Sequence, residues 1–450
     1  MIKKIIYFFS FLIFTFIVGC SFDDKTGIWA GDKKERKRLS EIEKEQKKIV
    51  DTVKLYSSED LYIKELHTVK NIVLSEPKKN LSWEMYGMNL QNFFGHIYMS
   101  GVENIFLKKK IGKNKFSIFK NLSTPLVFNN NIIFADDTGT IFSIDLRGKI
   151  NWKKNIYKKK YKKVYKNLTF SIYKNNIYIA DNIGFIYKIN SANGEVVWIK
   201  NHGIPLKSNI KIFKDNIFLI NQDNRLLCLN VDKGSLVWNV RSVSSFIKSQ
   251  SFLSLAISKD EDLIILNSSG DLVKLRTDNG RIYWTLSVLG SFFAHDTDFF
   301  RSSDIVLVDN DIILSTSTTT FSFNLINGQF NWETEIGSIN TPIIDGNNIF
   351  LMTDNGYFVN LNRKNGKIIW SINILKILKK KKQITKIAGY ILGSSKVYIV
   401  TQNGYLIICS ANSGQIESFK KIADTIYTNP IISNGSLYIL TENSKIIGFN

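Results

Sequence analysis

The sequence predicts an all-β protein, an eight-bladed β-propeller of four-stranded antiparallel blades, and three observations favour this fold. Apolar strand patterns separated by turns of the Asp/Asn-Gly type recur along most of the 450 residues. A glycine followed by strand residues and an aromatic residue returns about every 45 residues. Between these turns the patterning is that of strands, which distinguishes the chain from ankyrin and tetratricopeptide arrays. The period suits four short strands per repeat.

The N-terminus has the pattern of an export signal. Lys3 and Lys4 precede an apolar run from Ile5 to Val18, which is too short to span a bilayer comfortably. The run ends in Ile17-Val18-Gly19-Cys20, which resembles the lipobox of bacterial lipoproteins. This resemblance implies that Cys20 is acylated, and two or more acyl chains suffice for stable anchoring. The alternative is an ordinary cleaved signal with an incidental cysteine.

The residue after the lipobox cysteine and the segment that follows bear on where the protein is held. Ser21, rather than Asp, favours the outer membrane of a Gram-negative cell by resemblance to lipoprotein sorting rules. The chain then stays polar and densely charged to about Lys70, as one exposed helix or as a flexible tether with a nascent helix. We expect the tether. The predicted domains are therefore a signal peptide (1–19), an acylated cysteine with a tether (20–70) and a propeller (71–450).

Counting the repeats predicts how the ring closes. Eight strand-turn-strand units are present, the last ending at Asn450, but only seven are followed by a glycine-anchored strand. The anchor glycines are Gly148, Gly194, Gly234, Gly280, Gly328, Gly366 and Gly414. The last blade therefore lacks its outer strand and is expected to borrow one from around Asn104 to Ile111. Such closure removes open sheet edges that would otherwise template aggregation.

Six of the anchored strands carry a tryptophan at the same position: Trp152, Trp198, Trp238, Trp284, Trp332 and Trp370. A large indole that recurs in register in successive repeats indicates a packing device between blades, whereas a ligand stack would need only one or two. Cys228 and Cys409 lie in apolar strand runs four repeats apart. They are too distant for a disulfide in a ring of eight, so we expect two free, buried thiols.

The chain is strongly basic, with a net charge of +21. Its lysines are interspersed along the sequence, so a biased composition with a solvated surface is the favoured interpretation. Attraction to acidic lipid or to an acidic partner is the alternative. No nucleic-acid-binding motif accompanies the charge, and we expect no nucleic-acid partner.

The sequence offers little for catalysis. Its four histidines, His67, His96, His202 and His295, include no pair at metal-ligand spacing. No Ser/His/Asp or Cys/His arrangement is discernible, and the Asp/Asn-Gly turns lack the alternating carboxylates of a calcium loop. We therefore predict no catalytic residues, no metal, no cofactor and no enzymatic activity.

The cycle of apolar strand, "DNG" turn, strand and Gly-x-x-x-Trp resembles the PQQ-like propeller repeat from about Asn71 to Asn450. Quinoprotein dehydrogenases and the BamB-type lipoproteins of the outer-membrane β-barrel assembly machinery share this repeat. The lipobox and the length favour the BamB type. So do Asn71 to His96, which resembles the segment preceding the propeller in alphaproteobacterial members, and Asn267 to Trp284. Trp83 and Gly87 of that segment are in place, although its usual double glycine is reduced to one.

The BamB resemblance implies a non-catalytic scaffold at the periplasmic face of the outer membrane, which assists insertion of outer-membrane proteins. BamB proteins bind the periplasmic domains of the barrel-forming subunit BamA through loops at one end of the propeller. A Leu-x-Leu-Arg-Gly loop of the family matches Ser245 to Ser249, which implies contacts by Phe246, Ile247 and Lys248. A second loop with two aspartates corresponds to about Phe293 to Asp304. Its candidates are Asp296, Asp298 and Asp304.

Two other functions stay open from the sequence. One is a periplasmic or surface propeller that binds polysaccharide or an unrelated partner. The other is a PQQ-dependent dehydrogenase, which typically has an adjacent cysteine pair and insertions that build the cofactor cavity; this chain has neither. Unfolded outer-membrane protein clients are further possible partners, through strand addition to an exposed edge.

Overall fold

The computed structural model describes residues 37, 65–66, 72–116, 123–161, 163–241, 253–288, 301–379 and 385–450. The chain divides into two compact units, Met1–Ile63 and Lys64–Asn450. Lys37 is the one described residue of the first unit, so the predicted signal peptide and Cys20 lie outside the described residues. Among the residues that are described, no helix is both long and apolar enough to cross a membrane.

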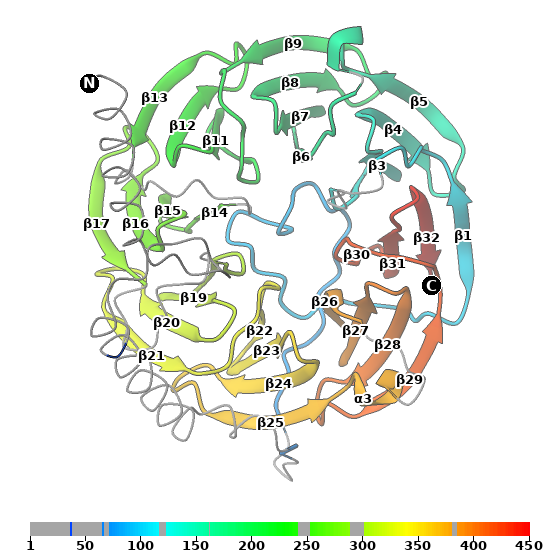
Figure 1. Ribbon diagram of the computed structural model, residues 1–450, viewed down its shortest axis with the longest axis vertical. Coiled ribbons are helices and arrows are strands. Elements are labelled where there is room, and N and C mark those ends of the chain that lie inside the picture. Colours follow the sequence, from blue (N-terminus) through cyan, green and yellow to red (C-terminus); the bar gives the residue numbers. More distant parts are fainter. Residues whose placement is uncertain are drawn as a thin grey trace, which may run out of the picture. The chain divides into compact units, whose positions relative to one another are not determined.

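The second unit is a ring of eight four-stranded antiparallel sheets around a central channel, as Figure 1 shows, which confirms the predicted propeller. We name the blades A to H and give their strands from the channel outwards. Blade A contains β2 (Leu126–Phe128), β3 (Asn131–Ala135), β4 (Thr140–Asp145) and β5 (Ile150–Asn155). Blade B contains β6 (Leu168–Tyr173), β7 (Asn176–Asp181), β8 (Phe185–Asn190) and β9 (Val196–Asn201). Blade C contains β10 (Lys211–Phe213), β11 (Asn216–Ile220), β12 (Arg225–Asn230) and β13 (Leu236–Arg241).

The next four blades repeat the same consecutive order. Blade D contains β14 (Ser254–Ile257), β15 (Asp262–Leu266), β16 (Asp271–Arg276) and β17 (Ile282–Ser287). Blade E contains β18 (Val306–Val308), β19 (Asp311–Ser315), β20 (Thr320–Asn324) and β21 (Phe330–Thr334). Blade F contains β22 (Ile343–Asp345), β23 (Asn348–Met352), β24 (Tyr357–Asn362) and β25 (Ile368–Asn373). Blade G contains β26 (Ile387–Gly393), β27 (Lys396–Thr401), β28 (Tyr405–Ser410) and β29 (Ile416–Lys421).

Blade H closes the ring with strands from both ends of the second unit. It contains β30 (Ile431–Ser433), β31 (Ser436–Leu440), β32 (Lys445–Phe449) and β1 (Ile105–Lys110). The outer strand β1 pairs antiparallel with β32, for example Lys108 with Ile447. The prediction that the last blade borrows a strand from residues 104–111 is confirmed. Two short helices, η2 (Lys159–Tyr161) and α3 (Lys376–Lys379), lie in connections between blades.

Burial within a blade follows from the position of each strand. A middle strand such as β12, with sequence RLLCLN, is packed on both faces, and its four central residues are buried. The outer strand β13 faces solvent on one side and is largely exposed. Cys228 in β12 and Cys409 in β28 are free and buried, as expected. Burial raises the pKa of the Cys228 thiol to about 12, so this thiol is inert at neutral pH.

Turn chemistry fixes where the strands reverse. Between β7 and β8, the Asp181 carboxylate accepts hydrogen bonds from the backbone N–H groups of Ile183, Gly184 and Phe185 at 2.8–2.9 Å. Such an Asx turn holds the chain in the tight reversal that this sequence pattern predicts. Since the strands run antiparallel, turns alternate between the two ends of the ring, and this alternation defines the site geometry below.

Candidate functional site

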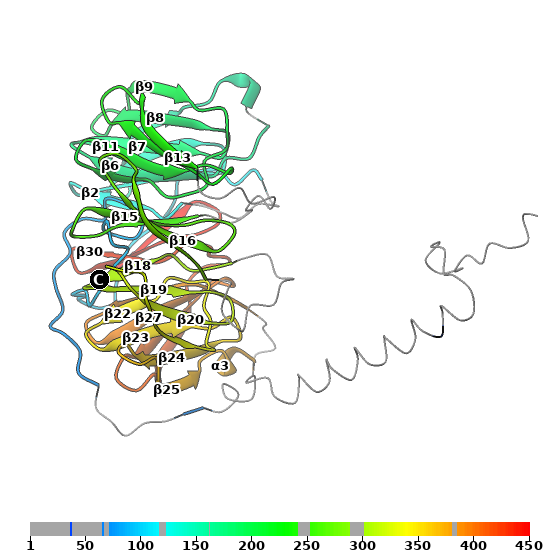
Figure 2. The ribbon, with the colours of Figure 1, turned by 90° about the vertical axis from the view of Figure 1, so that its left-hand side faces the viewer.

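Residues 72–103, here called the strap, cross one end of the central channel before the chain enters β1. Figure 1 shows the strap as a blue trace across the centre of the ring, and Figure 2 shows it on the left-hand face. Trp83 forms a bridge with Val127 of β2 through two backbone hydrogen bonds of 2.7 and 3.0 Å. Further bridges join Met85 to Ser171 and Ile97 to Gly393.

The strap hydrogen-bonds to every blade. Its partners, in blade order, are Val127, Ile172, Lys211, Ile257, Leu307, Asp345, Leu392 and Gly435. The buried Asn92 side chain joins two neighbouring blades, because its amide nitrogen donates to the Leu255 carbonyl at 3.1 Å and to the Ile305 carbonyl at 2.9 Å. The strap therefore ties the eight innermost strands together at one end of the ring, which we call the strap end.

A buried lysine holds the middle of the strap. Lys211 of β10 is fully buried, and its Nζ donates to the carbonyl oxygens of Tyr86 at 3.0 Å and Asn89 at 2.5 Å. Burial lowers the pKa of Lys211 to about 7, while the Asp304 carboxylate opposes that shift. The lysine thus supplies hydrogen bonds to two backbone carbonyl groups of the strap.

The opposite end of the channel holds a cavity of about 250 Å³. Its lining includes Tyr86, Thr169, Asp304, Asn340 and Asn429. Asp304 accepts a hydrogen bond from Thr341 Oγ1 at 3.1 Å. Burial, together with the nearby Asp304 carboxylate, raises the pKa of Tyr86. The lining is thus mostly amide and hydroxyl groups with one carboxylate, suited to hydrogen bonding. Within the described residues, no three His, Cys, Asp or Glu side chains gather closely enough to hold a metal ion.

The predicted contact loops leave the ring at this same end, which we call the loop end. The connection between β13 and β14 leaves after Arg241 and returns at Leu253, and the connection between β17 and β18 leaves after Val288 and returns at Arg301. Both join an outer strand to the next inner strand, so both leave and re-enter the ring at the end opposite the strap. The predicted contacts Phe246, Ile247, Lys248, Asp296 and Asp298 lie outside the described residues. Asp304 is described and lines the channel.

The six repeated tryptophans lie between blades. Each is the third residue of its outer strand and follows a register shift in the pairing with the neighbouring strand. A Cβ added to the anchor glycine of the following blade would lie 2.4–3.0 Å from the indole ring. These glycines also have φ between +61° and +73°, so both backbone conformation and space require glycine there.

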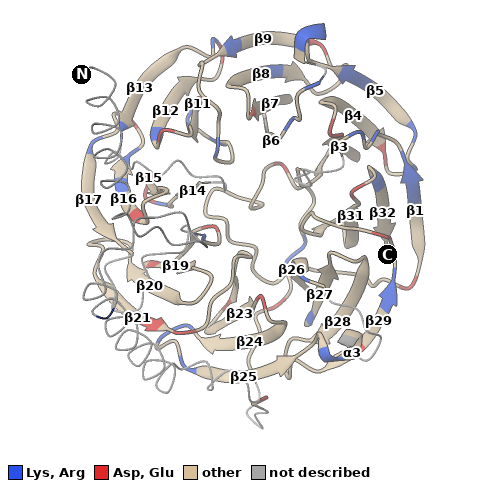
Figure 3. Ribbon diagram, viewed as in Figure 1, with Lys and Arg blue, Asp and Glu red and all other residues tan. Residues whose placement is uncertain are grey.

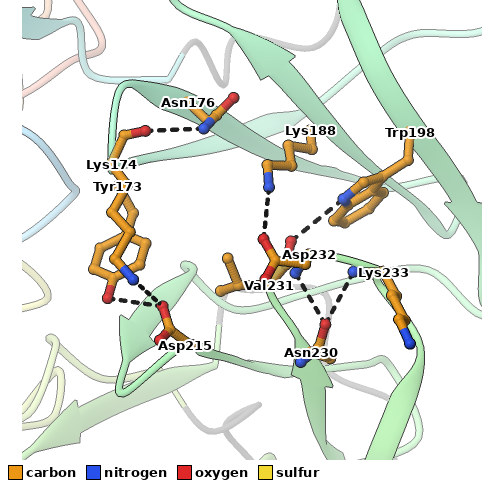
Figure 4. Close-up of polar contacts among 10 residues, drawn as sticks. All are labelled: Tyr173, Lys174, Asn176, Lys188, Trp198, Asp215, Asn230, Val231, Asp232 and Lys233. Atoms are coloured by element: carbon orange, nitrogen blue, oxygen red, sulfur yellow. Dashed lines mark hydrogen bonds and ion pairs between the residues drawn. The ribbon is translucent and has the colours of Figure 1, made fainter.

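Figure 4 shows one such junction, between blades B and C. The Trp198 Nε1 donates to the Val231 carbonyl at 3.3 Å, and Lys188 pairs with Asp232 at 3.1 Å. In the turn between β10 and β11, Asp215 receives hydrogen bonds from Tyr173 and Lys174. These contacts join adjacent blades into one rigid scaffold, and they place the tryptophans away from the channel.

Lys211 is a residue that the sequence reasoning did not single out. At its position most innermost strands carry apolar residues, such as Leu126, Val306 and Ile343, and blade B carries Ser171. A charged residue at this mostly apolar position was the available signal. Its role is to bind the strap, which lies more than 100 residues earlier in the chain. The repeat pattern alone therefore does not predict this role.

Comparison with known proteins identifies the family. The family model described as outer membrane protein assembly factor BamB matches residues 137–372. BamB from Moraxella catarrhalis has 14% identity and a TM-score of 0.62, with 76% of this chain and 100% of that chain covered. A europium-containing methanol dehydrogenase has 12% identity and a TM-score of 0.63, with 80% and 90% covered. A quinohemoprotein alcohol dehydrogenase from Comamonas testosteroni has 12% identity and a TM-score of 0.62, with 82% and 80% covered.

These levels of structural similarity at low identity show the propeller fold, which dehydrogenases and BamB share. No curated protein sequence matches the chain significantly. The family model is therefore what separates the two groups, and it extends from the second strand pair of blade A to the outer strand of blade F. Because this match spans more than half of the chain, the protein belongs to the PQQ-like propeller family of the outer membrane protein assembly factor BamB.

Proposed function

We propose that the protein is a non-catalytic scaffold lipoprotein of the outer-membrane β-barrel assembly machinery. In this role it binds the periplasmic domains of the BamA-type barrel-forming subunit and orients them to receive unfolded outer-membrane proteins. Membership of the BamB family is the observation that carries the proposal. We further infer that acylated Cys20 anchors the chain at the periplasmic face of the outer membrane.

The geometry of the ring is consistent with a scaffold. The strap fills one end of the channel and is hydrogen-bonded to all eight blades, so this end offers few free backbone groups. The loop end carries the connections between β13 and β14 and between β17 and β18, which arise from neighbouring blades. Loops on a rigid support are a common place for a partner to bind, and the described ends of these two connections belong to neighbouring blades.

The proposed contacts are Phe246, Ile247, Lys248, Asp298 and Asp304. Lys248 stands where the family loop has arginine, which keeps the positive charge but loses the bidentate fork of a guanidinium. We therefore expect Lys248 to contribute charge attraction rather than a geometrically fixed pair. Asp304 would contribute through the mouth of the channel, where its carboxylate already accepts a hydrogen bond from Thr341.

Co-purification tests the proposal directly. The tagged full chain is expressed in its own cell and isolated from outer membranes solubilised in mild detergent. Retention of the barrel-forming subunit, at a level well above that of unrelated lipoproteins, is the expected result. Its absence under conditions that retain other membrane complexes would refute the scaffold role. Metabolic labelling with palmitate, lost in Cys20→Ser, separately tests the anchor.

A further inference from the structure

Charge is distributed very unevenly around the ring. Residues 105–166, here called the basic sector, contain sixteen Lys and Arg against three Asp, a formal charge of +13 out of +21 for the chain. Residues 254–335, the acidic sector, contain five Lys and Arg against twelve Asp and Glu, a formal −7. Figure 3 shows blue segments along β1, β5 and η2 and red ones near β15, β19 and β21. A uniform compositional bias does not produce such opposite sectors.

The fold brings the lysines of the basic sector together on the outer rim. The outer strand β1 of blade H lies beside the turn into β5 of blade A, since a Cβ on Gly148 would be 2.9 Å from Leu107 and 3.0 Å from Lys109. Thirteen Lys and Arg of this sector are exposed: Lys108, Lys109, Lys110, Lys113, Lys115, Arg147, Lys149, Lys153, Lys154, Lys158, Lys159, Lys160 and Lys163. Two adjacent outer strands and the segment around η2 thus form one continuous surface.

The carboxylates of the basic sector do not neutralise this surface. Asp136 and Asp137 are buried and accept backbone hydrogen bonds, from Lys113 and from Lys115 and Phe116 respectively. Asp145 accepts from the backbone N–H groups of Arg147 and Lys149 at 2.9 and 2.8 Å. All three carboxylates thus accept backbone hydrogen bonds within the sector. Among the described residues of the sector, none of them forms an ion pair with an exposed lysine or arginine.

Apolar side chains are interleaved with these lysines. Ile105 is 47% exposed, Ile150 is 40% exposed and Val164 is 42% exposed. The surface combines the outer strands β1 and β5 with the connections that follow them, and its exposed basic residues do not line the channel cavity. Twelve of the thirteen exposed basic residues are lysines, which act as mobile point charges rather than as bidentate forks. Dispersed lysines with interleaved apolar groups suit a broad anionic surface better than a single defined anion.

We propose that the basic sector is a binding surface for anionic phospholipid, which holds the rim of the ring against a membrane. Lysines close to an anionic bilayer are attracted by its surface potential, and exposed Ile and Val side chains insert at the headgroup boundary. The acidic sector is repelled, so the ring has a preferred orientation with blades H and A nearest the lipid. This surface is separate from the loop-end contacts, and the inference does not rest on the scaffold role.

Lysine footprinting on vesicles tests the surface and distinguishes it from the anchor. The full chain is mixed with vesicles of phosphatidylcholine alone, or with vesicles that also contain phosphatidylglycerol. Amine acetylation is then measured by mass spectrometry at low and high salt. We expect Lys110, Lys153, Lys154 and Lys158 to be protected about tenfold on anionic vesicles at low salt. Lys233, Lys364 and Lys367, exposed outside the sector, should react equally on both.

A matched pair of variants controls for net charge. The triple variant Lys110→Glu, Lys154→Glu, Lys158→Glu should lose the protection of the remaining sector lysines. The variant Lys233→Glu, Lys364→Glu, Lys367→Glu carries the same charge change and should keep it, with thermal unfolding showing that both variants fold. Equal acetylation on neutral and anionic vesicles would overturn the proposal. The proposal would also be overturned if these lysines were protected by an added acidic protein and not by anionic vesicles. An acyl anchor would bind neutral and anionic vesicles alike, whereas the basic sector should bind anionic vesicles alone. Loss of either type of binding can therefore be told from loss of the other.

Discussion

The two ends of the ring differ in how much of their chemistry is already used internally. At the strap end, backbone and side-chain groups of residues 72–103 are hydrogen-bonded to all eight blades, and Trp83 is only 2% exposed. At the loop end, connections of unequal length leave the outer strands, and the channel cavity opens among polar side chains. One end therefore determines whether the ring stays closed, and the other carries the surface proposed to bind a partner.

This difference teaches where substitutions should act. A change at the strap end removes contacts between residues far apart in the sequence, by 352 positions in one case, so it should cost stability first and function only through stability. A change in a loop at the other end should alter binding with little effect on unfolding. Four predictions test this separation, in decreasing order of their expected effect on stability.

The largest effect is expected for Trp83→Ala. Trp83 packs against Phe94 with ring centroids 5.6 Å apart and bridges Val127. Loss of a buried indole should reduce the free energy of unfolding by about 3–5 kcal/mol. Equilibrium denaturation in guanidinium measures it, with Phe330→Ala as the control, because Phe330 is 55% exposed on an outer strand. Equal losses in the two variants would show that the strap does not hold the ring together.

Lys211→Met should change the pH dependence of stability. The pKa of Lys211 is lowered from 10.5 to about 7 in the fold, so the unfolded chain binds more protons between these values. The free energy of unfolding of the wild type should therefore rise with pH above about 7, by at most about 1.4 kcal/mol per pH unit from this group. Below that pH the buried lysine is protonated, and the fold bears the whole cost of burying its charge. The Met variant should lack this component of the slope.

Denaturation curves across that pH range, taken in parallel for Lys214→Met, check the assignment. Lys214 is 61% exposed and pairs with Glu261 at the surface, so its variant should follow the wild-type slope. Parallel curves for the wild type and Lys211→Met would mean that Lys211 keeps an ordinary pKa in the fold.

Asp304→Asn should have an intermediate effect. The substitution weakens the hydrogen bond from Thr341 and removes the charge opposite Lys211, with an expected cost of about 1 kcal/mol. It should also lower the pKa of Lys211 further, which moves the rise in stability towards lower pH. The same denaturation series measures both effects. An unchanged pH profile would indicate that the two groups do not interact.

Lys248→Glu should have the smallest effect on stability, within about 0.5 kcal/mol, and should weaken association with the barrel-forming subunit about tenfold. The control is Lys233→Glu, an exposed lysine in the turn between β12 and β13 at the strap end. Co-purification yield and thermal unfolding are measured for both. A large loss of stability in Lys248→Glu would assign this lysine a structural role instead.

Much of the architecture was predictable because it repeats. The period near 45 residues, the Asx turns and the count of eight units against seven glycine-anchored strands predicted both the blades and the closing strand. Closure by β1 was predicted because the last of the eight units has no glycine-anchored outer strand of its own. The channel chemistry was not predictable in this way, because Lys211 interacts with the strap carbonyls of Tyr86 and Asn89, and these contacts break the repeat.

The charge pattern shows the same limit. In the linear sequence the lysines look interspersed, and a solvated surface of biased composition was the favoured interpretation. The structure adds a neighbourhood that the sequence does not show, because β1 comes from the N-terminal side yet lies on the rim next to blade A, where its lysines join those of β5 and η2. Neighbouring lysines on different strands become a patch only when the ring is closed.

The sequence by itself determined the strands, their turns, the number of blades and the family, because local periodicity and glycine conformation set these features residue by residue. Only the tertiary structure decided that the strap joins all eight blades, that Lys211 is buried beneath it, and that the lysines of β1 lie beside blade A on the rim. These features depend on contacts between residues far apart in the sequence, by 352 positions in one case, which no local pattern records.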